Sequence, residues 1–117
     1  MSTFRFLEYP VYIRARELHK SITDLADSLS NRQLRDQLGR ASLSIALNIA
    51  EGSAKKSSRD FARYIQVSLG SLNEVVACLD ILQSSGLLEP KAYLTYENDC
   101  QEVARQLGGL MKKLYAK

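Results

Sequence analysis

The chain has 117 residues, of which 45% are hydrophobic, and its 16 basic and 13 acidic side chains leave a net charge of +3. This length and composition indicate one globular domain, residues 1–117, that is large enough for a hydrophobic core. The mild charge permits an anionic partner without requiring one. The N-terminus carries no apolar signal segment, and we expect no stretch that crosses a bilayer. The protein should therefore be cytoplasmic, with no membrane partner.

The first half of the chain predicts two amphipathic helices. Pro10 suits a first helical turn, and apolar residues follow it at spacings of three and four. Ser30 with Gln33 resembles a capping box that opens a second helix. That helix should run to about Glu51, with Gly52 as its stop.

The second half predicts two more helices. Ser57 with Asp60 forms a plausible cap for a third helix, which should end at the run Ser84–Gly86. Pro90 then opens a fourth, which Gly108 and Gly109 interrupt by a bend, by fraying or by a close backbone approach.

Four amphipathic helices with short links predict an all-α fold, the antiparallel up-down-up-down four-helix bundle. Their seven-residue repeat favours shallow, left-handed crossings. Residues 1–9 form an N-terminal arm ahead of the bundle. The arm is too apolar for a free tail, so it should pack on the bundle or on a neighbour; its apolar residues are Phe4, Phe6, Leu7 and Tyr9.

The helix expected over residues 40–52 is apolar on two sides, so it has to be covered on two sides. Between these sides runs a narrow polar stripe, which we define as Gln37, Arg40, Ser44, Asn48 and Glu51. The stripe either faces water or packs at a contact between helices or subunits, with Ser71, Asn73 and Glu74 of the third helix as partners. A buried Arg40 would have to pair with Glu51 or Glu74, because an isolated buried charge costs several kcal/mol.

Basic residues gather where the second and third helices join. Lys55, Lys56, Arg59 and Arg63 are opposed there only by Asp60. One interpretation is a solvated helix end, and the other is an edge that contacts nucleic-acid phosphates. A second basic cluster lies at the C-terminus, formed by Lys112, Lys113 and Lys117. Both clusters have little aromatic interleaving, which predicts contacts to the backbone, weak sequence preference and no base stacking.

The sequence offers no catalytic arrangement, metal-ligand set or cofactor motif, so we expect no enzyme and no cofactor. Cys78 and Cys100 stand apart from each other on apolar faces and are interpreted as small core residues. His19 is the single histidine, and a solvated or capping role suits it better than a catalytic one.

The segment Gln37–Gly52 resembles the signature R-A-x-x-S-I-x-x-N-I-A-E-G of the bacterial four helix bundle proteins, also called S23 or 23S rRNA intervening-sequence proteins. Residues 58–64 resemble the element E-F-x-R-F/Y of that family, with Asp60 in place of the usual glutamate. Residues 70–74 resemble its element G-S-x-x-E. The usual Phe-Pro between the first two helices is absent. The resemblance spans about residues 10–90.

This resemblance implies a compact four-helix bundle that assembles as a homopentamer. It also implies a relationship to the accessory variability protein of diversity-generating retroelements, a basic pentameric barrel that binds nucleic acid and a reverse transcriptase. The leading hypothesis is therefore a non-enzymatic, oligomeric bundle that binds the backbone of RNA or DNA. The alternatives are a protein-interaction scaffold without nucleic-acid binding and a bundle enzyme.

Overall fold

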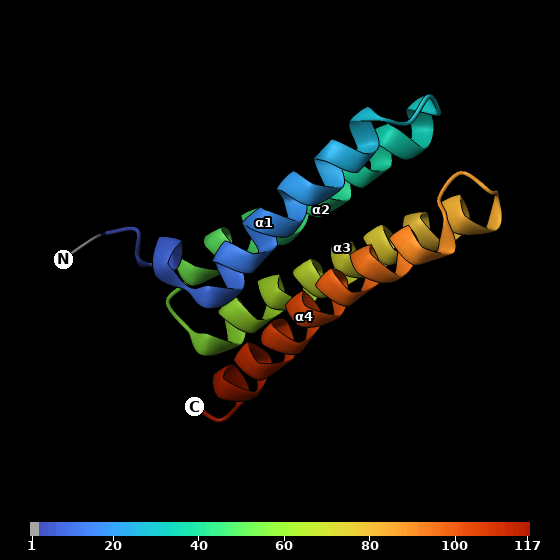
Figure 1. Cartoon of the computed structure of the whole chain (residues 1–117). Helices are drawn as coiled ribbons and strands as arrows, with labels where there is room; N and C mark the ends of the chain where they lie inside the picture. The colour runs from blue at the N-terminus through green and yellow to red at the C-terminus, as the bar shows by residue number, and fades with distance from the viewer. Residues whose placement is uncertain (1–2) are drawn as a thin grey trace.

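The computed structural model describes residues 3–117 and has four α-helices, as the sequence predicts (Figure 1). A short 3₁₀ helix, η1 (Arg5–Glu8), precedes α1 (Pro10–Asp27), α2 (Arg32–Ser53), α3 (Ser58–Ser84) and α4 (Pro90–Tyr115). Figure 1 shows the helices side by side along the 45 Å long axis of the molecule. α1 and α3 each pack against both α2 and α4. Because short links join successive helices, chain neighbours run antiparallel, and the all-α four-helix fold is confirmed.

Capping side chains explain where α2 and α3 begin. Ser57 caps α3 as predicted, since its hydroxyl accepts a hydrogen bond from the backbone N–H of Asp60 at 3.1 Å. The predicted cap of α2 is wrong by one residue. Asn31, not Ser30, is the N-cap, and its side chain accepts from the N–H of Leu34. Both residue types make good caps, so local sequence does not decide between adjacent candidates.

The end of α3 and the start of α4 follow the predicted signals. Gly86 has a φ of +75°, the left-handed conformation in which glycine is least strained. The N–H of Leu87 bonds the carbonyl of Leu82, and that of Gly86 bonds the carbonyl of Gln83. This pair of bonds is a Schellman motif, which satisfies carbonyls that α3 leaves unpaired. Pro90 then occupies the first position of α4.

The core is a continuous apolar column between the four helices. Its largest fully buried members are Ile22, Leu38, Ile45, Ile49, Ile65, Leu79, Leu82 and Leu107. The buried serines of the core have partners: the Ser68 hydroxyl, for example, donates to the carbonyl of Ile45, 2.9 Å away. Cys78 and Cys100 are free thiols buried in this core, which confirms their interpretation as small core residues.

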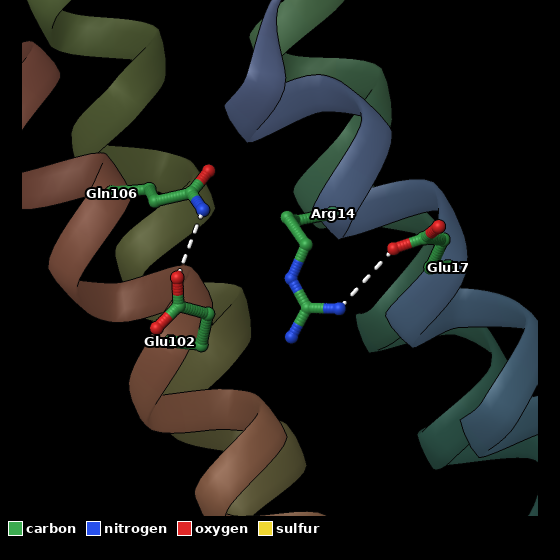
Figure 2. A network of polar contacts seen from close by, with 4 residues as sticks. All are labelled: Arg14, Glu17, Glu102 and Gln106. Atoms are coloured by element: carbon green, nitrogen blue, oxygen red, sulfur yellow. Dashed lines mark hydrogen bonds and ion pairs between the residues drawn. The ribbon is translucent and has the colours of Figure 1, made fainter.

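Polar side chains line the seam between α1 and α4 (Figure 2). Arg14 of α1 pairs with Glu17 at 3.2 Å, and its guanidinium lies in the space facing Glu102 and Gln106 of α4. Hydrogen bonds from Arg105 and Gln106, with the nearby charge of Arg14, hold the pKa of Glu102 below its usual value. The seam thus brings charged groups of both signs together at the surface of the bundle.

α3 corrects the expectation that no segment is long enough to span a bilayer. By length and composition alone, Ser58–Ser84 passes the test for a membrane-spanning helix. The core helix of a bundle passes the same test, and α3 buries Ile65, Leu72 and Leu79 among its neighbours. Its exposed side carries polar residues such as Glu74. Burial in the bundle therefore accounts for part of the apolar character of α3, whose Val67 and Ile81 remain exposed.

The N-terminal arm packs on the bundle, although not with all its apolar residues. η1 contacts α1 and α2, and the Phe6 ring meets the Tyr12 ring edge-on with centroids 5.0 Å apart. Phe4 and Leu7 are exposed. The first two residues of the arm, Met1 and Ser2, lie outside the described part of the chain.

Unlike Gly86, three other glycines, Gly52, Gly108 and Gly109, act differently from their predicted roles. Gly52 does not stop α2, which continues to Ser53; it is buried where α2 meets α3, and a Cβ there would lie 2.8 Å from the Cβ of Tyr64. α4 runs without a break through Gly108 and Gly109, where an added Cβ would meet nothing within 4 Å. Neither glycine of α4 therefore serves a close backbone approach.

Candidate nucleic-acid interface

The two basic clusters lie at one end of the bundle. Lys55 and Lys56 are exposed on the link between α2 and α3, and Lys113 lies in the last turn of α4. Because α3 and α4 run antiparallel, the end of α4 comes beside the start of α3 (Figure 1). We name the exposed cations there the basic end, and define it as Lys55, Lys56, Arg59, Arg63, Lys113 and Lys117.

The basic end surrounds an open hollow of about 860 Å³. Four lysines line it, from two segments far apart in the chain: Lys55, Lys56, Lys113 and Lys117. Among the described residues that line the hollow, none is acidic. The surface at its mouth therefore attracts anions, and the sequence did not indicate that the two clusters share one site.

The hollow has an apolar lining, and its volume lies within the range usual for ligand sites. Its apolar walls come from the start of α1, from α3 and from α4, and include Tyr9, Val11, Phe61, Leu110 and Leu114. Aromatic rings therefore do lie beside the lysines, contrary to the expectation from the clusters alone. Tyr9 comes from a part of the chain far from both clusters. Phe61, in the first turn of α3, lines the hollow together with the lysines of the link.

Arg59 and Arg63 extend the basic end along α3. Both are exposed, and Arg63 lies 3.9 Å from Asp60, an ion pair too exposed to hold the guanidinium firmly. Beside them, the Nζ of Lys55 lies 5.0 Å from the centroid of the Tyr64 ring, a cation–π contact. A second hollow, of about 490 Å³, is lined by Lys55, Asp60, Arg63, Tyr64 and Val67. The cationic surface thus continues beyond the first hollow.

The polar stripe of α2 forms a hydrogen bond across to α3 at its centre. Asn48 donates to the Ser44 carbonyl at 2.8 Å and to its hydroxyl at 3.0 Å. The Ser71 hydroxyl in turn donates to the Ser44 hydroxyl at 2.8 Å. Of these bonds, only the Ser71–Ser44 bond joins the two helices, whereas both Asn48 bonds lie within α2.

Farther along the stripe, Arg40 differs from the expectation of a buried ion pair. It is exposed and donates to Gln37, whose amide donates to the carboxylate of Glu74 on α3. Arg40 is therefore linked to Glu74 only through Gln37. Glu51 is exposed, and within residues 3–117 its carboxylate has no hydrogen bond or ion pair to the stripe.

Apolar side chains flank the stripe on the solvent side of α2 and α3. Leu43 and Leu47 are 42% and 56% exposed, and Val67 of α3 is 51% exposed. The antiparallel register that joins Ser44 to Ser71 places Val67 near the level of Asn48. We call this surface the outer face, and define it as Leu43, Leu47 and Val67 with the stripe between them.

His19 is not a helix cap, and it is only partly solvated. It is half-buried, and its Nδ1 lies 2.9 Å from the hydroxyl of Ser42, a fully buried residue of α2. The bond joins α1 to α2, which is a structural role. Within residues 3–117 no group of three His, Cys, Asp or Glu side chains is placed to hold a metal ion.

Comparison with known proteins agrees with the fold and with the signature on α2. The chain is similar to a solved protein of unknown function from the S23 ribosomal protein family of Bacteroides thetaiotaomicron, at 26% identity and a TM-score of 0.81. That match covers 87% of this chain and 98% of the other. A search of curated proteins gives no match. The sequence model of the 23S rRNA-intervening sequence protein family matches residues 8–109. The chain therefore belongs to the family of 23S rRNA-intervening sequence proteins.

Proposed function

We propose that this protein is a non-enzymatic, oligomeric bundle that binds the phosphate backbone of RNA through its basic end. The observation that carries the proposal is the convergence of Lys55 and Lys56 with Lys113 and Lys117 around one hollow without acidic lining residues among those described. Backbone binding draws on such clustered cations and gives affinity that falls with salt. These lysine side chains are exposed to solvent, so the basic end is available to an anionic partner.

The position of the cations favours a strand over a point anion. The four lysines surround the hollow, while Arg59 and Arg63 continue the positive surface along the first turns of α3. A single small anion would engage only part of this set. A nucleic-acid strand presents phosphates at regular intervals and would meet several cations at once.

We further propose that copies of the bundle assemble through the outer face, as a homopentamer in line with the family resemblance. The support is the two-sided apolar character of α2: Ile45 and Ile49 are fully buried, whereas Leu43 and Leu47 remain largely exposed. Burying these side chains between copies would remove apolar area from water. Assembly would also repeat the basic end several times, which strengthens a modest charge.

Fluorescence anisotropy with a labelled single-stranded RNA tests the binding proposal. We expect binding at low salt that weakens steeply between about 50 and about 200 mM salt. The double variant Lys55→Gln/Lys56→Gln should lower the slope of log affinity against log salt by about 0.7 for each phosphate that the variant no longer neutralises. The matched control is Lys20→Gln/Lys91→Gln, which has the same net charge but changes exposed lysines away from the basic end.

Two results would contradict RNA binding at this site. One is no binding by the parent protein at low salt, which would leave the interaction scaffold as the better hypothesis. The other is an equal loss of affinity in both double variants, which would show that net charge alone, and not the basic end, attracts RNA.

A further inference from the structure

We infer that the hollow at the basic end receives one unpaired nucleotide of a bound strand, with its base against the apolar lining and its phosphates among the lysines. This inference rests on the proposed RNA binding and deepens it, because it names which part of the nucleic acid the site takes. It predicts a preference for single-stranded segments or ends over uninterrupted duplex.

The lining of the hollow is partly cationic and partly apolar, which suits the phosphate and the base of a nucleotide. Lysines supply donors for phosphate oxygens, while Phe61 and Tyr9 supply half-buried aromatic surface next to aliphatic Leu110 and Leu114. Bases stack on aromatic side chains largely irrespective of their identity, since every base has a π-face. The volume of about 860 Å³ is ample for a base and its sugar.

Duplex RNA cannot use this lining. Its bases are stacked and paired inside the helix, and its exposed surface is phosphate and 2′-hydroxyl. A duplex would therefore reach the lysines and leave the apolar walls unfilled. An unpaired nucleotide would contact both the lysines and the apolar walls. Its neighbours along the strand would meet Arg59 and Arg63 on α3.

Gly109 keeps one side of the hollow open. It lines the hollow from α4, and a Cβ added there would meet nothing within 4 Å. A helix with glycine in its interior is less stable than one with alanine there. No close backbone contact explains why residue 109 is a glycine. Gly108 is its matched neighbour: it is exposed and equally unhindered in the same helix, but it does not line the hollow.

Gly109→Phe places a ring where the nucleotide would enter, and Gly108→Phe is the control. Both changes replace a helical glycine in open space, so both variants should fold, which thermal melts followed by circular dichroism would verify. Anisotropy is measured with a labelled uridine strand and with an abasic strand of equal length and phosphate number. Comparing the affinities of the parent protein for these two strands tests the contribution of the bases without relying on any protein variant.

The parent protein should bind the uridine strand about tenfold more tightly than the abasic strand, because stacking is lost in the latter. Gly109→Phe should lower its affinity for the uridine strand to the abasic level, and Gly108→Phe should leave both affinities unchanged. Equal, salt-sensitive binding of both strands by the parent, or parent-like binding by Gly109→Phe, would overturn the nucleotide site and leave backbone binding standing. Binding of neither strand would overturn the proposed function itself. Free uridine monophosphate and the unlabelled uridine strand can each be tested as competitors of the labelled strand. If both displace it at the same concentration, the assignment of the site to a strand is overturned.

Discussion

Gly52 and Tyr64 mark a very close approach of α2 to α3. A Cβ built on Gly52 would lie 2.8 Å from the Cβ of Tyr64 and 2.9 Å from the Cδ1 of Phe61. Real Cβ atoms do not approach so closely, so the two helices meet here only because residue 52 has no side chain. Since Phe61 also lines the hollow, this contact positions a wall of the candidate site.

Gly52→Ala should lower the free energy of unfolding by about 1–3 kcal/mol, the usual cost of overpacking a tight contact. Urea unfolding followed by circular dichroism would measure it. Gly39→Ala is the control in the same helix: nothing lies within 4 Å of an added Cβ there, so it should stabilise the protein by up to about 1 kcal/mol. Equal stability of the two variants would contradict the close approach of α2 and α3.

Thr23 carries a buried hydroxyl without a hydrogen-bond partner among the described residues. Thr23→Val keeps the side-chain shape and removes this unsatisfied group, so it should raise the free energy of unfolding by about 1 kcal/mol. The melting temperature should rise by about 4 °C for a chain of this size. Thr95→Val, at an exposed position whose hydroxyl bonds the Lys91 carbonyl, should give no such gain. A Thr23→Val variant that melts at or below the parent temperature would refute this account.

Stability should fall at alkaline pH because of Cys100. Burial, with the nearby charges of Asp99 and Glu97, raises the pKa of its thiol from 9.0 to about 12. Below pH 9 the thiol holds its proton in both the folded and the unfolded state, and its contribution is complete. Above that pH the unfolded thiol ionises while the folded one does not, so the free energy of unfolding declines by up to about 1.4 kcal/mol per pH unit until the folded pKa is reached.

Urea unfolding of the parent and of Cys100→Ala at about pH 8, 9.5 and 10.5 separates this effect from other titrating groups. At about pH 8 the variant will be less stable than the parent because of the cavity it leaves. Its stability should nevertheless decline less steeply above pH 9 than that of the parent. Parallel declines would show that Cys100 does not contribute.

Leu47→Asp should dissociate the proposed assembly into single chains. A carboxylate in the outer face would be buried between copies without a partner, which opposes association. Multi-angle light scattering after size exclusion should give a multiple of 13.1 kDa for the parent and a single-chain mass for the variant. Leu94→Asp changes a similarly exposed leucine of α4, away from the outer face, and should keep the parent mass. A parent that is already a single chain at micromolar concentration would contradict assembly.

Local signals in the sequence predicted the helices well. The Ser57 cap, the helix end at residues 84–86 and the Pro90 start each depend on a few neighbouring residues, and each was confirmed. The error at Gly52 came where a distant residue decides. Gly52 carries the same local signal as a helix stop, and only its contact with Tyr64 reveals that packing is the reason for the glycine.

The candidate site was only half predictable for the same reason. The link lysines were found by their density along the chain. Their meeting with Lys113 and Lys117 depends on which helix ends lie side by side, and composition does not encode that. An antiparallel bundle with short links implies that the end of α4 returns to the start of α3, and this signal was available in the predicted topology. The hollow itself depends on side chains from three separate stretches, residues 9–11, 53–61 and 106–117, and could not be read from any one of them.

An even number of antiparallel helices returns the chain to the end where it began. Pro10 and Val11 at the start of α1 and Ala116 and Lys117 after α4 all line the same hollow, and Figure 1 shows the start of α1 and the end of α4 at the same end of the bundle. An affinity tag or fusion partner on either terminus would therefore crowd the candidate site and mask binding. Recombinant protein for the RNA measurements should have its tags cleaved, and reporters belong at the opposite pole, in the turns at residues 28–31 or 85–89.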